Sequence, residues 1–199
     1  MILVGTCTAL AQQNSVSTSR SQGAQNGQKG FYIGLDYMNL TDVKTTSHTK
    51  FYDVERTEES SGGTHLGLAG VTLGYNQTPE KGLGFSAGAR FLEAFNKSET
   101  DDEKVQLIIP EGNLTLAANR YLAGYLGLNA GIFTGNENIR QYKAQLGGQV
   151  GFGIRFSSNM ALNMGYTILN EKLKESMGPF EVEADARISG FNSNIAYTF

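Results

Sequence analysis

The stretch AQLGGQVGFGIRF, residues 144–156, decides the fold. Large apolar side chains recur at almost every second position in it, from Leu146 to Phe156, and glycine, glutamine or arginine stands between them. Successive side chains of a β-strand point to opposite faces, so this pattern predicts a strand with one apolar face and one small, polar face.

The same period of two recurs along the chain. It is clear in residues 31–37, 83–95 and 160–168, and it returns in 64–76 and 182–199 with a change of phase near Gly70 and near Gly190, where β-bulges are predicted. Residues 105–133 also fit a helical face, but their glycines would weaken a helix, so they are interpreted as two strands that turn at residues 119–120. The sequence therefore predicts eight strands.

The predicted connections alternate in length. The longer, polar or charged ones are residues 42–63, 96–104, 135–141 and 170–181, and the shorter ones are residues 77–82, 119–120 and 157–159. Short turns at one end and longer loops at the other are typical of an outer-membrane barrel. The fold class predicted is all-β: an antiparallel, up-and-down, eight-stranded transmembrane β-barrel.

Composition restricts the other possibilities. The chain has 199 residues, 25 glycines and a net charge of -3 with no basic block, which argues against nucleic acid as a partner. Residues 1–11 are predicted to be a signal peptide cleaved after Ala11, with lipidation of Cys7 as the alternative. Residues 12–29 form a flexible polar leader and residues 30–199 the barrel domain in this prediction.

The character of the polar face separates a membrane barrel from a soluble one. That face is rich in Gly, Ala, Ser, Asn and Gln with isolated charges, which suits a crowded lumen, whereas a water-facing strand favours β-branched and long polar side chains. The opposite face is apolar over nearly its whole length, as contact with lipid requires. A soluble lipocalin-like barrel that binds a ligand stays an alternative at this point.

The end of the chain carries a resemblance to a known family. Residues 191–199 alternate apolar and small or polar side chains and end in phenylalanine, through Phe191, Ser193, Ile195, Tyr197 and Phe199. The chain resembles the eight-stranded outer-membrane β-barrel family, which includes the transmembrane domain of outer-membrane protein A and opacity-type surface proteins. This resemblance implies a bacterial outer-membrane location among lipid and lipopolysaccharide, and recognition of the terminal strand by the barrel-assembly machinery.

Charged and polar residues on the small-residue face are predicted to line the lumen. An eight-stranded barrel has an interior that side chains just fill, so these groups are expected to pair and plug it. The predicted lumen network consists of Asp36, Arg90, Gln145, Gln149, Arg155, Asp185 and Arg187.

Catalytic and metal chemistry is not indicated. The two histidines, His48 and His65, have no spacing that links them to a catalytic triad, and no enzyme activity or cofactor is expected. The acidic cluster of Glu99, Asp101, Asp102 and Glu103 lacks the turn glycine of an ordered calcium loop, so a solvated loop tip is the interpretation and no metal site is predicted.

The leading functional hypothesis is a structural or interaction protein of the outer membrane, which presents four surface loops for adhesion or envelope integrity. The longest loop, residues 42–63, mixes both charge signs with Phe51 and Tyr52 and is the expected site of contact with an extracellular partner. A narrow channel for small solutes is the alternative.

Overall fold

The computed structural model describes residues 27–51, 54–95, 105–134, 143–177 and 180–199. Within them are nine strands and no helix that is long and apolar enough to cross a membrane. The strands are β1 (Gln28–Phe51), β2 (Val54–Thr78), β3 (Gly82–Ala94), β4 (Gln106–Ala117), β5 (Leu122–Ala130), β6 (Ile132–Thr134), β7 (Lys143–Arg155), β8 (Met160–Met177) and β9 (Phe180–Thr198).

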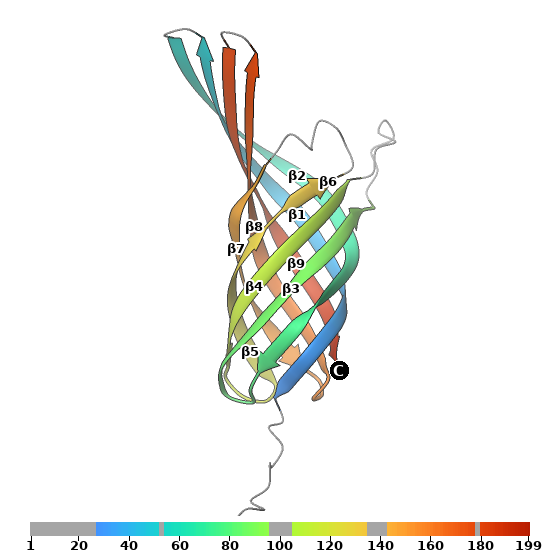
Figure 1. Cartoon of the computed structure of the whole chain (residues 1–199). Helices are drawn as coiled ribbons and strands as arrows, with labels where there is room; N and C mark the ends of the chain where they lie inside the picture. The colour runs from blue at the N-terminus through green and yellow to red at the C-terminus, as the bar shows by residue number, and fades with distance from the viewer. Residues whose placement is uncertain (1–26, 52–53, 96–104, 135–142, 178–179) are drawn as a thin grey trace, which may run out of the picture.

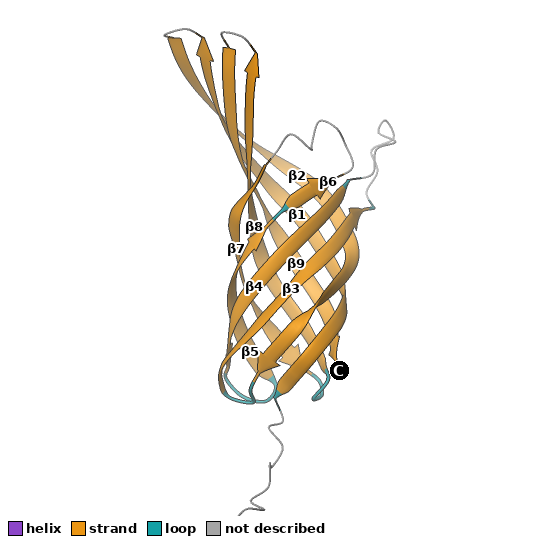
Figure 2. Cartoon of the chain, viewed as in Figure 1, coloured by secondary structure: helices purple, strands orange, loops and turns teal. Residues whose placement is uncertain are grey.

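The strands form one closed antiparallel ring (Figures 1 and 2). Its order is β3-β2-β1-β9-β8-β7-β5-β4, and β4 returns to pair with β3. Both β5 and β6 pair with β4 and are separated only by Gly131, so they are two parts of one strand and the ring has eight positions. This confirms the predicted eight-stranded barrel, including the two strands predicted within residues 105–133.

Large apolar side chains cover the outside of the ring. Phe31, Leu35, Leu126 and Leu146 are each about two-thirds exposed or more, which would be unfavourable in water and is what a lipid environment requires. Aromatic rings contact one another edge to face or tilted at the end of the barrel where the C-terminus lies, as in the contacts Phe31–Tyr75 and Tyr75–Phe85. The outward apolar band therefore marks the membrane-spanning part of the strands.

Glycines on the inner face make room for two tyrosines. A Cβ placed at Gly74 or Gly88 would lie 2.6 Å from the Tyr32 hydroxyl, and one placed at Gly151 or Gly165 would lie within 2.5 Å of the Tyr125 hydroxyl. The high glycine content thus has a packing reason: without side chains at these positions, two aromatic rings fit across a narrow lumen.

Two of the predicted loops are wrong, because the structure has long β-hairpins there. The described residues of 42–63 and 170–181 continue β1, β2, β8 and β9, which extend beyond the rest of the barrel at the end opposite the C-terminus (Figure 1). The segments 42–51, 54–63, 170–177 and 180–189 pair with one another as a four-stranded sheet in the order β2-β1-β9-β8. We call it the projecting sheet.

The positions of the predicted β-bulges also need correction. The register of β2 is continuous through Gly70 on both sides, so no bulge occurs there. An irregularity does lie beside Gly190, but it belongs to β1, whose pairing with both neighbours shifts between Leu40 and Asp42, while β9 pairs with β8 without interruption. A second shift lies in β7, between Gln145 and Gly148.

Candidate functional site: the filled lumen and the projecting sheet

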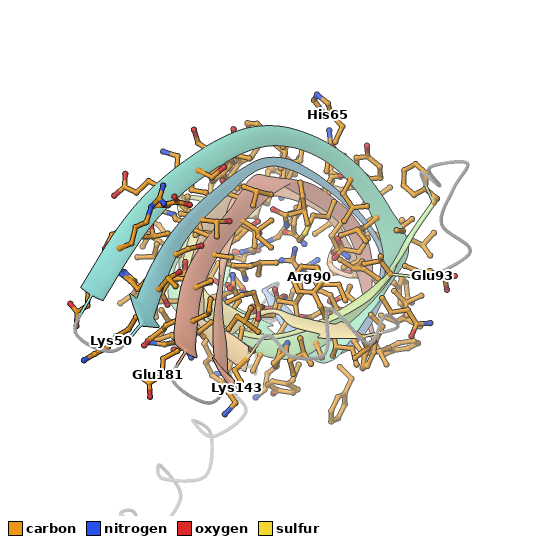
Figure 3. All side chains as sticks on the ribbon, turned by 90° about the horizontal axis from the view of Figure 1, so that it is seen from above. Lys50, His65, Arg90, Glu93, Lys143 and Glu181 are labelled. Atoms are coloured by element: carbon orange, nitrogen blue, oxygen red, sulfur yellow. The ribbon has the colours of Figure 1, made fainter. Side chains whose placement is uncertain are left out.

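A buried arginine organises the middle of the lumen. Arg90 on β3 lies inside the ring in the view along the barrel (Figure 3). Its Nη2 is 2.7 Å from Glu111 Oε2 and its Nε is 3.5 Å from Asp36 Oδ2, and all three side chains are at most 6% exposed. Arg90 also donates a hydrogen bond to Gln149 Oε1 at 3.1 Å, and Gln149 donates to Glu111 at 2.9 Å. We call Asp36, Arg90, Glu111 and Gln149 the Arg90 network.

Asparagines add hydrogen bonds around this network, although Asp36 Oδ1 is buried without a partner. Gln149 donates to Asn113 Oδ1 at 2.6 Å, and Asn194 donates to Asp36 Oδ2 at 3.4 Å. The side-chain amide of Asn192 is oriented so that both its nitrogen and its oxygen have hydrogen-bond partners. In this orientation the oxygen accepts a hydrogen bond from Arg90 Nη1 at 2.6 Å. These contacts join five strands, β1, β3, β4, β7 and β9, across the lumen. Such a network favours a structural plug, because buried charges are tolerated only when they are paired and hydrogen-bonded.

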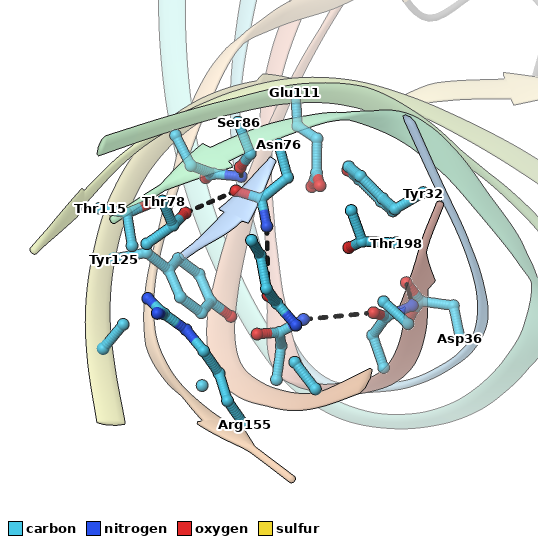
Figure 4. Close-up of a pocket in the computed structure, with 18 of the residues that line it drawn as sticks. Tyr32, Asp36, Asn76, Thr78, Ser86, Glu111, Thr115, Tyr125, Arg155 and Thr198 are labelled. Atoms are coloured by element: carbon cyan, nitrogen blue, oxygen red, sulfur yellow. Dashed lines mark hydrogen bonds between the residues drawn. The ribbon is translucent and has the colours of Figure 1, made fainter. Parts of the chain in front are cut away.

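A small polar cavity lies on the terminal side of the network (Figure 4). Its volume is about 80 Å³, and the residues around it include Tyr32, Asn76 and Arg155. Arg155 donates to the carbonyl oxygen of Pro79 at 2.9 Å, which ties β7 to the turn between β2 and β3. This half of the lumen therefore holds polar groups and a little open space.

The other half of the lumen is filled mainly by apolar side chains, with the buried Glu171 on β8 beyond Leu169. On β1, β3 and β4, the inward residues next to the Arg90 network on the side of the projecting sheet are apolar, and their exposed fractions are 3% or less. We call this group the apolar layer; its members are Met38, Leu40, Leu68, Leu92, Leu107, Ile109 and Leu169. The layer closes the lumen between the Arg90 network and the projecting sheet, and sequence reasoning missed it.

The structure brings together only part of the predicted lumen set. Asp36, Arg90 and Gln149 meet in the Arg90 network. Arg155 also lies in the lumen, but at the end of the barrel with the short turns, beside Pro79. The prediction is wrong for the other three residues, which are exposed: Gln145, Asp185 and Arg187.

Register explains these three errors. On β7 the register with β8 shifts between Gln145 and Gly148. Gln145 therefore no longer points to the same side of the strand as the inward-facing Gln149. On β9 the pairing with β8 is continuous, so the even positions face inward from Thr198 to Ala184 and the odd positions 185 and 187 face outward.

Sequence reasoning also missed Glu111, Asn113, Asn192 and Asn194. A usable signal was present for Glu111 and Asn113, which alternate with Gly112, Leu114 and Leu116 in a stretch whose character was ambiguous.

The projecting sheet is stabilised by polar cross-strand contacts. Lys50 forms an ion pair with Glu55 at 3.3 Å, His48 Nδ1 lies 3.0 Å from Thr57 Oγ1, and Lys172 pairs with Glu183. The hydrogen bond to the Glu183 carboxylate raises the pKa of the Lys172 ammonium above its ordinary value. Such pairs suit strands that stand in water on both faces.

Not all of the predicted contact site can be described. The backbone of Phe51 ends β1 and pairs with Val54 and Phe180, and Tyr52 lies outside the described residues. Their role in contacts stays a prediction.

The terminal strand closes the ring. The Phe199 amide donates to the carbonyl oxygen of Phe31 at 2.9 Å, and the Phe199 ring, 73% exposed, contacts the Tyr197 ring. Phe191 and Ile195 are also exposed on the outer face. Recognition of these residues by an assembly machinery stays a prediction.

The histidines do not form a catalytic arrangement in the described part of the chain. His48 contacts Thr57 on the projecting sheet, whereas His65 lies exposed on the outside of the ring (Figure 3). Among the described residues, no three His, Cys, Asp or Glu side chains are grouped to hold a metal ion. The acidic cluster of Glu99, Asp101, Asp102 and Glu103 lies outside the described residues.

A closed ring of eight antiparallel strands with an outward apolar band and a filled interior defines an integral β-barrel of the outer-membrane class. The chain belongs to the outer membrane protein beta-barrel domain family, whose family model matches residues 2–199. The protein is therefore placed in the bacterial outer membrane, among its lipids and lipopolysaccharide. The resemblance inferred from the terminal strand is confirmed, and the soluble lipocalin-like barrel is excluded.

Two solved outer-membrane structures are similar to the chain, and the first of them shares its fold. The outer membrane protein OprG from Pseudomonas aeruginosa is 16% identical, with a TM-score of 0.53, and the match covers 87% of this chain and 98% of that chain. Neisserial surface protein A is 13% identical, with a TM-score of 0.49, and the match covers 85% of this chain and 97% of that chain. A search of the curated proteins gave no match.

Proposed function

We propose that the protein is an adhesive surface protein, in which the barrel holds the projecting sheet outside the cell as a platform for contact. The observation that carries this proposal is the length of the strands. β1 and β2 have 24 and 25 residues, whereas β3 and β4 have 13 and 12. A membrane-spanning strand needs about 9–11 residues, so β1 is longer than a span requires by about 13–15 residues. Its projecting segment, residues 42–51, is roughly 30 Å long.

The edges of the projecting sheet fit this role. β2 pairs with β3 only from Leu68 onward, so the edge of its segment 54–63 has no strand partner among the described residues. Exposed charges lie along that edge, including Glu55, Arg56 and Glu58. Charged edges discourage indiscriminate strand pairing and keep such a sheet soluble, and they leave its faces free to bind.

The test removes the projecting sheet and keeps the barrel. Residues 44–61 and 172–185 are each replaced by Asn-Gly, which joins the cross-strand partners Val43 and Gly62, and Glu171 and Ala186, by two-residue turns. Bacteria that express either form are then compared for adhesion to cultured epithelial cells, mucin and glass, and for settling by self-aggregation.

Both forms must first show the gel shift between heated and unheated samples that marks a folded barrel. We expect adhesion to at least one surface, or self-aggregation, to fall to the level of cells without the protein when the sheet is shortened. Equal behaviour of the two forms in every assay would overturn the proposal.

A narrow conduit for small solutes is the second candidate, and the polar cavity of about 80 Å³ favours it. The apolar layer opposes it, because its closely packed side chains fill the path between that cavity and the projecting sheet. Planar-bilayer recordings separate the two: a steady current through the purified protein would support the conduit, and its absence would support a plugged barrel.

A further inference from the structure

A pair of cationic residues lies on the outer face of the projecting sheet, next to the edge of the outward apolar band. Lys44 on β1 and Arg187 on β9 are cross-strand partners, and both side chains are exposed. Together with Tyr166, Ser189 and Asp42 they surround a hollow of about 270 Å³. Two cations and one carboxylate give the hollow a net positive charge.

An apolar groove begins directly below that hollow. Its volume is about 540 Å³, and it shares Tyr166 with the hollow above. Its floor includes Gly112 and Gly148, which face outward in the row Ile168–Gly148–Leu128–Gly112 across β8, β7, β5 and β4. The groove forms because these two positions are glycines, without side chains, in a row of large apolar residues.

The groove descends from the membrane surface toward the middle of the bilayer. On β8 the next outward residue after Ile168 is polar Asn170, so this end lies at the edge of the apolar band. On β4, outward apolar residues lie on both sides of Gly112, so the other end lies deep in the band. Three strand spacings of about 4.8 Å make the groove roughly 14 Å long.

We propose that Lys44, Arg187 and the groove together bind one molecule of lipid A, the phosphorylated and acylated part of lipopolysaccharide. The cationic pair holds a phosphate of the headgroup, and one acyl chain lies in the groove below Tyr166. Charge complementarity argues for this occupant, because a phosphate monoester carries more negative charge than the phosphodiester of an ordinary phospholipid and matches two cations side by side. The proposal shares with the proposed function the placement of the projecting sheet at the outer surface.

The test uses the full chain folded in phosphatidylcholine nanodiscs and native mass spectrometry with added lipid A. The headgroup variant is K44Q/R187Q, and the matched control is K50Q/R56Q, which removes two cations from the same sheet away from the groove. The groove variant is G112L/G148L. A Cβ at Gly112 meets nothing within 4 Å and one at Gly148 lies 3.6 Å from the nearest atom, so the backbone has room for side chains that extend into the groove.

The wild-type chain and K50Q/R56Q are expected to retain one lipid A. Retention is expected to fall at least about tenfold in K44Q/R187Q, because each cation near a membrane surface contributes about 1 kcal/mol. G112L/G148L is expected to lose binding with its cations intact, and lipid A stripped of phosphate is not retained by the wild type.

Three results would overturn the proposal. The first is that K44Q/R187Q retains as much lipid A as the wild type. The second is that the control K50Q/R56Q loses as much lipid A as K44Q/R187Q. The third is that the wild type retains phosphatidylglycerol as well as it retains lipid A. The outcome is separate from that of the adhesion test, because all of these variants keep the projecting sheet and only the adhesion test shortens it.

Discussion

Replacing Arg90 by methionine tests whether the Arg90 network stabilises the barrel. Methionine keeps much of the side-chain volume and removes the charge, which leaves the carboxylates of Asp36 and Glu111 buried in one small space at 1% and 6% side-chain exposure. Removing one partner of a buried ion pair costs about 3–5 kcal/mol, because the remaining charge is desolvated without compensation. The expected loss in the free energy of unfolding is therefore about 4 kcal/mol.

The assay is reversible urea unfolding of the purified barrel in lipid vesicles, followed by the gel shift between heated and unheated samples. If the free energy falls by about 2 kcal/mol per molar urea, a loss of 4 kcal/mol lowers the midpoint by about 2 M. The triple variant D36N/R90M/E111Q removes all three charges together and is expected to recover most of this loss.

Lys50→Met is the control, since it breaks an exposed ion pair whose contribution is less than about 1 kcal/mol. A midpoint for R90M that falls no further than that of the control would refute the reasoning. So would a triple variant that is less stable than R90M alone, because the cost would then not come from unpaired charge.

Three further predictions follow from the packing. Gly88→Val is expected to destabilise the barrel by about 1–3 kcal/mol in the same urea assay, because its side chain overlaps neighbouring backbone and the Tyr32 hydroxyl, whereas Gly112→Val on the outer face should cost little. Phe199→Ala is expected to lower the fraction of folded barrel in the outer-membrane fraction; an unchanged fraction would argue against a role in assembly. The double variant L107S/L169S breaks the apolar layer and is expected to permit a measurable current in a planar bilayer, where the wild type shows none.

The membrane-spanning part of this fold is predictable because each face of a strand has one dominant character. In residues 149–156 the apolar set faces lipid and the small or polar set faces the lumen, and residues 83–88 behave in the same way. Asp36 and Arg90 were found because they are isolated charges in phase with inward glycines. Their partner Glu111 was missed because its own stretch also fits a helical face.

The projecting sheet was not predictable from the same signal. Its strands have water on both faces, so polar and charged residues such as Lys44, Thr45 and Thr46 follow one another. Without alternating apolar residues, this pattern predicts a loop. The apolar layer was hidden for a related reason. Met38 and Leu40 share the inward phase of Asp36, so the inward face of β1 also becomes apolar there and alternation no longer distinguishes lumen from lipid.

The central claim is that the projecting sheet stands outside the cell while the short turns face the periplasm. The most direct measurement is labelling of single cysteines with a membrane-impermeant maleimide, in a chain whose Cys7 is replaced by serine. Ser61→Cys on the projecting sheet is predicted to label fully on intact cells, and Ser157→Cys in the turn between β7 and β8 only after the outer membrane is permeabilised. Labelling of Ser157→Cys on intact cells, with Ser61→Cys protected, would contradict the account.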